Sequence, residues 1–231
     1  MYGYVFDGVY QTSDFEIWAD GTMHLKPGIT DITQHFGKDV QPGYVKYKDI
    51  DGDGKITDKD RTTIGNGQPD FYGGITNNFY LYGIDFSFMF QFTYGNDVYN
   101  AQRMFANQTD LEMQNMAGEV RNRWRANYAS NTVPSAKGIV RNDVYSRFIE
   151  DGSYLRLKNI TLGYTFPHKL MRNIYVTKLR IYATAENLFC LTKYSGSDPE
   201  VNMRSGNLMP SFDYGAYPRS KVFTFGVELN F

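Results

Sequence analysis

Lys221-Val-Phe-Thr-Phe-Gly-Val-Glu-Leu-Asn-Phe231 decides the fold, and it is the last stretch of the sequence. Its residues alternate with the period of two that is typical of an extended strand. One face carries Phe223, Phe225, Val227, Leu229 and Phe231, and the other carries Val222, Thr224, Gly226, Glu228 and Asn230. This pattern fits a half-buried soluble strand and also a strand between lipid and a wet lumen. Because a soluble chain rarely ends on an unprotected apolar strand, Phe231 favours the membrane strand.

The bulk composition is compatible with a membrane barrel. The 231 residues include 19 tyrosines and 17 phenylalanines, which suit boundaries where one end of the ring is dry and the other is wet. A net charge of −1 argues against a nucleic-acid-binding protein. The one cysteine, Cys190, excludes an internal disulfide framework. Since no secretory signal follows Met1, we expect a fragment of a longer exported protein.

Alternating segments also occur ahead of the terminal strand. Residues 71–94 predict a hairpin with a tight turn at Gly83. Its second half places on one face Phe86, Phe88, Phe90, Phe92 and Tyr94. So many aromatic rings on one face are hard to bury in a small soluble core, but they can face lipid. Residues 153–189 predict two more strands, and a change of apolar parity between Leu157 and Ile160 indicates a β-bulge.

The connections between the predicted strands alternate in length. Residues 1–70, 95–152 and 190–218 are long loops, the connections at Gly83 and Pro167 are short, and residues 219–231 form the final strand. Bacterial barrels have short periplasmic turns and long extracellular loops, so we expect Phe231 on the periplasmic side. Each strand has about the 9–11 residues that cross a bilayer when tilted. Because the smallest bacterial barrels have about eight strands, these strands must pair with others outside this chain.

One short helix is expected inside the loop 95–152. Thr109-Asp-Leu-Glu112 has the residues of a capping box at a helix start. Apolar residues then follow at helical spacing, namely Met113, Met116, Val120 and Trp124. Packing against a core is the favoured role of this apolar stripe, ahead of contact with a ligand.

Asp49-Ile-Asp-Gly-Asp-Gly-Lys-Ile-Thr-Asp-Lys-Asp60 has the spacing of a calcium-binding loop. Its ligand positions are occupied by Asp49, Asp51, Asp53, the carbonyl of Lys55, Thr57 and Asp60. Gly54 permits the sharp turn and Ile56 would fix the loop to a core. The last position is aspartate rather than glutamate, as in dockerin-type loops. We predict a structural calcium ion in an extracellular loop, and the alternative is an acidic turn without an ion.

The sequence predicts no enzyme active site. His24, His35 and His168 are far apart and lack the spacing of metal ligands, and Cys190 has no base near it in sequence. No glycine-rich loop joins a strand to a helix in the way that phosphate binding requires. A hydrolase would need a carboxylate pair, for which Asp198 and Glu200 are available, but both belong to a loop motif of this sequence.

Several motifs occur together in a characteristic order. The most specific is Glu150-Asp-Gly-Ser-Tyr-Leu-Arg-Leu-Lys-Asn-Ile-Thr-Leu-Gly-Tyr164. The others are Lys46-Tyr-Lys-Asp-Ile-Asp-Gly-Asp-Gly54, Asp60-Arg61, Ile64-Gly65, Pro69-Asp-Phe-Tyr-Gly-Gly74, Glu186-Asn-Leu-Phe189, Tyr194-Ser-Gly196, Asp198-Pro-Glu200 and Tyr217-Pro-Arg219. Together they resemble the SusC/RagA class of TonB-dependent outer-membrane transporters over nearly the whole chain.

The resemblance implies the C-terminal part of a barrel of about 22 strands in the outer membrane of a Gram-negative bacterium. It implies a plug domain and a TonB box that this chain lacks, through which the TonB complex supplies energy. It also implies a SusD-like surface lipoprotein as partner and an oligosaccharide or peptide as substrate. Loops 95–152 and 190–218 are the expected contact regions, and Phe231 would belong to the signal for barrel assembly.

A secreted calcium-dependent β-sandwich that binds carbohydrate is the alternative. It accounts for the calcium motif, the tyrosines and the strands. It does not account for the aromatic face from Phe86 to Tyr94 or for the terminal Phe231. We therefore expect an all-β fold, with antiparallel strands of a large transmembrane barrel in contact with outer-membrane lipid, long extracellular loops and one short helix.

Overall fold

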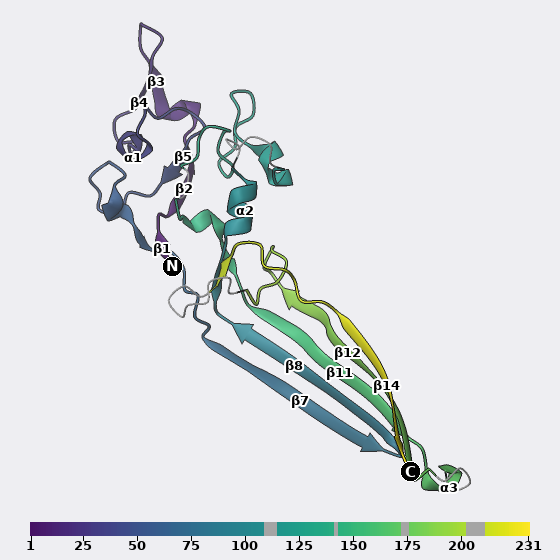
Figure 1. Ribbon diagram of the computed structural model, residues 1–231. Helices are drawn as coiled ribbons and strands as arrows, with labels where there is room; N and C mark the ends of the chain where they lie inside the picture. The colour runs from purple at the N-terminus through teal and green to yellow at the C-terminus, as the bar shows by residue number, and fades with distance from the viewer. Residues whose placement is uncertain (109–114, 141–142, 172–175, 202–210) are drawn as a thin grey trace.

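The computed structural model describes residues 1–108, 115–140, 143–171, 176–201 and 211–231. They form a long antiparallel sheet and, at one end of that sheet, an outer lobe (Figure 1). No helix among these residues combines the length and the apolar character needed to span a membrane.

The sheet contains five strands in the order β14-β12-β11-β8-β7. Their bounds are β7 Phe71–Leu81, β8 Ile84–Tyr94, β11 Tyr154–Thr165, β12 Lys178–Thr192 and β14 Val222–Asn230. Each of these strands pairs antiparallel with the long strand that precedes or follows it along the chain. The prediction of antiparallel strands is confirmed, although β12 runs three residues beyond the expected end at 189.

The strand registers separate apolar from polar side chains. One row across the sheet joins Phe88, Ile160, Ala185 and Phe223, and the next joins Ser87, Thr161, Thr184 and Thr224. The apolar face is uncovered, with Phe225 at 81% and Val227 at 64% exposure. The β-sandwich alternative requires a second sheet over such a face. Among the described strands none is packed there, so the sandwich has no support.

Two local features of the sheet follow from the sequence. The turn between β7 and β8 has positive φ at both Tyr82 (47°) and Gly83 (84°), as a two-residue hairpin turn with the correct twist requires. The register of β11 shifts between Leu157 and Asn159 against both of its neighbours, so the predicted bulge is confirmed.

The outer lobe combines the long loops into one folded unit. Its short strands are β1 Tyr2–Gly3, β2 Phe6–Val9, β3 Phe15–Ile17, β4 Met23–Leu25, β5 Val45–Tyr47, β6 Thr62–Thr63, β9 Asp97–Asn100, β10 Ile149–Asp151 and β13 Phe212–Asp213. The sheet β10-β9-β13 joins the second and third long loops. The fully buried side chains of the lobe core include Tyr4, Tyr10, Tyr47, Ile56 and Phe148.

The helices differ from the prediction. The capping box Thr109–Glu112 and Met113 lie outside the described residues. Beyond them only a 3-10 helix, Gly118–Asn122, forms, because the chain is already extended at Arg123 and the Trp124 N–H donates to the Val133 carbonyl at 2.9 Å. The predicted helical run to Trp124 is therefore wrong in its described part.

Three short α-helices occur in the described chain instead of the one predicted. They are α1 Thr33–Phe36 and α2 Ala101–Ala106 in the lobe, and α3 His168–Met171 between β11 and β12. Helix α2 begins after Asn100, whose side chain accepts a hydrogen bond from the Arg103 N–H at 2.8 Å. Three further 3-10 helices are Thr12–Asp14, Asp58–Asp60 and Ser146–Phe148.

Candidate functional site

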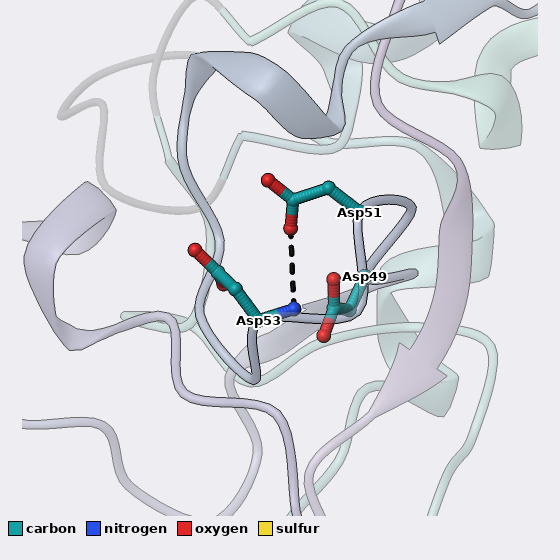
Figure 2. A group of neighbouring side chains, drawn as sticks. All are labelled: Asp49, Asp51 and Asp53. Carbon is teal, nitrogen blue, oxygen red and sulfur yellow. Dashed lines mark hydrogen bonds between the residues drawn. The ribbon is translucent and has the colours of Figure 1, made fainter.

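The acidic loop of the lobe brings three carboxylates together. One oxygen each from Asp49, Asp51 and Asp53 lies within 4.8 Å of the others (Figure 2). The loop winds around Asp49, whose Oδ1 and Oδ2 accept hydrogen bonds from the N–H groups of Gly52 (2.7 Å) and Gly54 (2.8 Å). Both glycines have positive φ, which their lack of a side chain makes possible without strain. This arrangement concentrates negative charge on one side of the loop.

The loop is fixed to the rest of the lobe from behind. The Asp31 N–H donates to the Gly54 carbonyl at 2.8 Å, and the Ile56 N–H donates to the Asp31 carbonyl at 2.9 Å. Ile56 is fully buried in the lobe core, as its place in the motif predicts. The three carboxylates therefore lie on an anchored backbone.

The last two predicted ligand side chains have other partners. Both oxygens of the fully buried Asp60 accept backbone hydrogen bonds at 2.8 Å, one from Ile50 and one from Thr57. Burial alone would raise the pKa of Asp60, but these N–H groups hold the pKa below its usual range. The Thr57 hydroxyl accepts from the Lys59 N–H and caps the 3-10 helix Asp58–Asp60. Asp60 and Thr57 thus close the loop rather than join the three carboxylates.

Calcium takes about 6–8 oxygen ligands in flexible geometry. Asp49, Asp51 and Asp53 fit that requirement, and the Lys55 carbonyl follows them at the position that usually supplies a backbone ligand. The arrangement therefore fits a hard cation through these residues, with solvent completing the shell. Asp60 would first have to release its backbone donors.

A buried ion-pair cluster ties the segment after β12 to the polar face of the sheet. The Arg156 guanidinium on β11 lies 2.5 Å from Asp198 Oδ1 and 3.8 Å from Glu200 Oε2. Arg219 reaches Glu200 Oε1 at 2.7 Å from the other side. The side chains of Arg156 and Asp198 are only 5% and 6% exposed. Both carboxylates proposed for a hydrolase are thus engaged by arginine, which makes them anchors of this segment.

A second network joins the loop segments within the lobe. The Ser195 N–H and hydroxyl donate to the two oxygens of Glu150 at 2.8 Å, and Arg103 lies 3.0 Å from the same carboxylate. Arg103 also contacts Glu119 at 2.8 Å, and Arg147 reaches it at 3.2 Å. Arg103 donates hydrogen bonds to Glu119, and these are the main reason why the pKa of Glu119 is lowered to about 2. The loops at the lobe end of the sheet therefore form one cross-linked unit.

Two further ion pairs lie on the polar face, at the end of the sheet away from the lobe. Asp85 on β8 contacts Arg180 on β12 at 2.5 Å, across the intervening strand β11. The crossing point is Gly163, where a Cβ would collide with the Asp85 carboxylate. Lys178 and Glu228 pair at 2.7 Å between β12 and β14. Charged groups on this face require water or polar protein beside them.

The other residues singled out in the sequence lie apart. His24 stacks on Trp18 with ring centroids 3.9 Å apart, while His168 is exposed in α3 and Cys190 is half-buried in β12. His35 Nε2 lies 2.8 Å from Asp143 Oδ2, and this hydrogen bond raises the pKa of His35. The spacing along the chain gives no signal for the His35 contact. Phe231 is 85% exposed at the end of the sheet away from the lobe (Figure 1).

The chain is similar to known proteins along its whole length. No family model matches it. It is 32% identical over 240 residues to TonB-dependent receptor P3 of Formosa agariphila, a match that covers all of this chain and 22% of that protein. It is 31% identical over 204 residues to TonB-dependent receptor SusC of Bacteroides thetaiotaomicron, covering 84% of this chain and 18% of SusC.

Solved structures give a matching fold. A chain of the RagAB peptide importer in its open-open state matches with a TM-score of 0.70 and 22% identity, over 100% of this chain and 22% of that one. A structure of the closed-closed state matches with the same TM-score. The chain thus spans only about a quarter or less of the length of the curated relatives it matches.

Proposed function

Because the chain belongs to the SusC/RagA class of TonB-dependent receptors, we propose that it forms part of the wall and outer mouth of a barrel that imports nutrients across the outer membrane of a Gram-negative bacterium. The observation that carries this proposal is the two-sided sheet. Its apolar face is uncovered, with Phe225 at 81% exposure, and its other face carries ion pairs such as Asp85 with Arg180. A wall between lipid and a wet lumen requires this division.

The orientation follows from where the long connections gather. Long loops of bacterial barrels are extracellular, so the lobe lies outside the cell and the turn at Gly83 and helix α3 face the periplasm. Both edge strands of the sheet, β7 and β14, would pair with further strands of the same barrel.

The orientation can be tested by labelling intact cells. In the full-length protein with Cys190→Ser, we expect a membrane-impermeant maleimide to label Lys59→Cys in the lobe but not Lys169→Cys in α3. Both positions are exposed, so accessibility of the side chain itself is matched. Labelling of Lys169→Cys alone would reverse the orientation, and labelling of both would refute a wall that crosses the membrane.

We propose that the cross-linked loops at the mouth support a SusD-like lipoprotein partner. This proposal is supported by the similarity to SusC and to the RagAB peptide importer. The substrate would be an oligosaccharide or a peptide, and energy would come from the TonB complex. Co-purification of the full-length protein with its lipoprotein, before and after removal of the Ser195 hydroxyl, tests the role of the mouth.

We also propose a structural calcium ion at Asp49, Asp51 and Asp53. Calorimetry on the full-length protein should show binding of added calcium, weakened by Asp51→Asn and Asp53→Asn. The matched control is Asp58→Asn, because Asp58 is 88% exposed in the same segment and outside the three-carboxylate group. Absence of binding at millimolar calcium, or an equal effect of the control, would refute the site.

Phe231 is proposed as part of the signal that directs barrel assembly. Its ring is 85% exposed and contributes little to packing in this chain. Phe231→Ala should therefore lower the amount of full-length protein in the outer membrane, without changing the thermal stability of the molecules that assemble. Unchanged amounts in the membrane would remove this role.

A further inference from the structure

A hairpin projects from the outer lobe at the end farthest from the long sheet (Figure 1). It consists of β3 and β4, whose register pairs Phe15 with Leu25 at its root and Ile17 with Met23 nearer its tip. The root is held in the lobe, because Phe15 is buried in the lobe core and Leu25 packs against that core. The hairpin is thus a fixed projection of the lobe.

The tip of the hairpin is held in one conformation by its own groups. The indole ring of Trp18 stacks on the His24 ring with centroids 3.9 Å apart. The Thr22 hydroxyl lies 2.8 Å from His24 Nε2 and donates to Asp20 Oδ1 at 2.6 Å. The Trp18 N–H donates to the Thr22 carbonyl at 2.9 Å. Because the tip is already ordered, a partner that binds it loses little affinity to further ordering.

Large apolar side chains are exposed on both faces of this tip. Ile17 and Met23 lie on one face, where Ile17 is 66% exposed, and Trp18 lies on the other face at 57% exposure. The acidic side chains of Glu16 and Asp20 are exposed beside them. Exposed apolar groups that lie together with a polar rim mark an interaction site.

The surroundings of Trp18 favour a protein as the ligand. A sugar ring stacked on an indole also needs free hydrogen-bonding groups beside it for its hydroxyls. Here the nearby polar groups of Asp20, Thr22 and His24 are engaged with one another. Membrane lipid does not suit the tip either, because the sheet lies at the opposite end of the molecule (Figure 1). An apolar pocket of a protein would cover both faces of the tip at once.

We propose that this hairpin anchors the lipoprotein partner, with Trp18 inserted in an apolar pocket whose rim carries cationic side chains. The proposal rests on the partner and the orientation proposed above, which place the hairpin outside the cell. Further wall strands would join the sheet at β7 and β14, far from the hairpin, so they leave its tip free for a separate protein (Figure 1). Aromatic anchors in such pockets carry much of the binding energy of protein interfaces, and Glu16 and Asp20 complement a basic rim.

The affinity of the full-length protein for its purified lipoprotein, measured by biolayer interferometry in detergent, tests the anchor. Trp18→Ala should raise the Kd about thirtyfold, or about 2 kcal/mol. The matched control is Tyr128→Ala, which removes another exposed aromatic ring of the lobe and should leave the Kd unchanged. Glu16→Lys should raise the Kd about threefold at low salt and have less effect at high salt.

A further variant separates loss of the anchor from loss of the hairpin fold. Ile17→Ser leaves the stack of Trp18 on His24 in place and should still raise the Kd about tenfold, because it removes the apolar contact on the other face. Hydrogen exchange of residues 15–25 in each variant shows whether the hairpin stays folded. Wild-type affinity in both Trp18→Ala and Ile17→Ser would overturn the anchor, as would an equal loss in Tyr128→Ala.

Other ligands of the hairpin give different results. Binding to a printed glycan array that Trp18→Ala abolishes, with unchanged affinity for the lipoprotein, would overturn the anchor in favour of a sugar platform. A dimer of the full-length protein that Trp18→Ala dissociates would overturn it in favour of a second copy. If the wild-type protein does not bind the lipoprotein at all, the proposed partner fails as well, whereas binding that is insensitive to the hairpin refutes the anchor alone.

Discussion

The outer lobe and the long sheet use aromatic side chains in opposite ways. In the lobe, Tyr4, Tyr10 and Tyr47 are fully buried, whereas in the sheet Phe223 and Phe225 are 61% and 81% exposed. The lobe hides its rings from water in the ordinary manner of a soluble domain. The sheet exposes them on one face and carries its ion pairs on the other. One chain thus combines a lobe with a buried aromatic core and a sheet with an exposed aromatic face.

The largest effect should come from truncating a ring in the lobe. Tyr47 stacks on Tyr4 with ring centroids 4.9 Å apart and donates to Asp143 at 2.9 Å. Tyr47→Ala should destabilise the lobe by about 3–5 kcal/mol, because it leaves a cavity in the lobe core and removes one of the two hydrogen bonds that Asp143 Oδ2 accepts. Hydrogen exchange of lobe peptides in the full-length protein measures this loss. The sheet counterpart Phe225→Ala should leave lobe exchange unchanged, and a comparable effect of both would remove the distinction between the two regions.

The junction between the regions should be nearly as sensitive. Arg156→Met leaves Asp198 buried without its cation, which typically costs about 3–5 kcal/mol. Protease cleavage or hydrogen exchange in residues 193–201 and 211–219 should rise accordingly. Arg219 is 40% exposed, so Arg219→Met should cost about 1 kcal/mol or less. Equal effects of the two substitutions would show that burial of Arg156 does not hold this segment.

Acid should weaken the lobe through Glu119. The pKa of Glu119 is lowered from 4.5 to about 2, so its contribution to stability is present above pH 4.5 and is lost as the pH falls toward 2. Because Glu119 is partly exposed, solvent screening reduces the effect. In Glu119→Gln, the unfolding temperature of the lobe should depend less steeply on pH in this window than it does in the wild type. An unchanged slope would assign the acid response to other carboxylates.

The smallest effect is expected at His35. Its hydrogen bond to Asp143 raises the pKa of His35 above 6.5 in the folded lobe. The resulting stabilisation is complete below pH 6.5 and is lost as the pH rises through the raised value. The charged and titratable neighbours on the elements around it are Asp143, Tyr4, Asp58, Arg61 and Tyr47. His35→Gln should remove this decline in stability with pH, and persistence of the decline would contradict the assignment.

The same division explains what could be predicted from the sequence. Successive residues of a strand point to opposite faces of the sheet, and here one face is apolar and the other polar. The type of each residue therefore indicates the face on which it lies. The bulge at Leu157–Asn159 was therefore predictable from a change of parity, and so was the turn at Gly83. The local winding of the acidic loop also belongs to this class, because its glycines and aspartates are neighbours in the chain.

The lobe was much less predictable, because its contacts join distant residues. Glu150 accepts hydrogen bonds from Ser195, which is 45 positions away, and His35 is hydrogen-bonded to Asp143, which is 108 positions away. No periodic pattern in the sequence predicts either contact. The helical spacing toward Trp124 was misleading, since tertiary contacts hold that residue in an extended segment. Asp60 matched a ligand position in the motif, yet its oxygens have backbone partners.

The most direct test of the wall compares two neighbouring positions on β14. Spin labels at Phe225→Cys and Thr224→Cys, in the full-length protein with Cys190→Ser in membranes, are probed with lipid-soluble oxygen and a water-soluble nickel complex. Phe225 lies on the apolar face and Thr224 on the polar face of the same strand. Oxygen should relax the label at 225, from which the nickel complex is excluded, whereas the nickel complex should reach the label at 224. Equal access of the nickel complex to both positions would show that the sheet does not separate lipid from lumen.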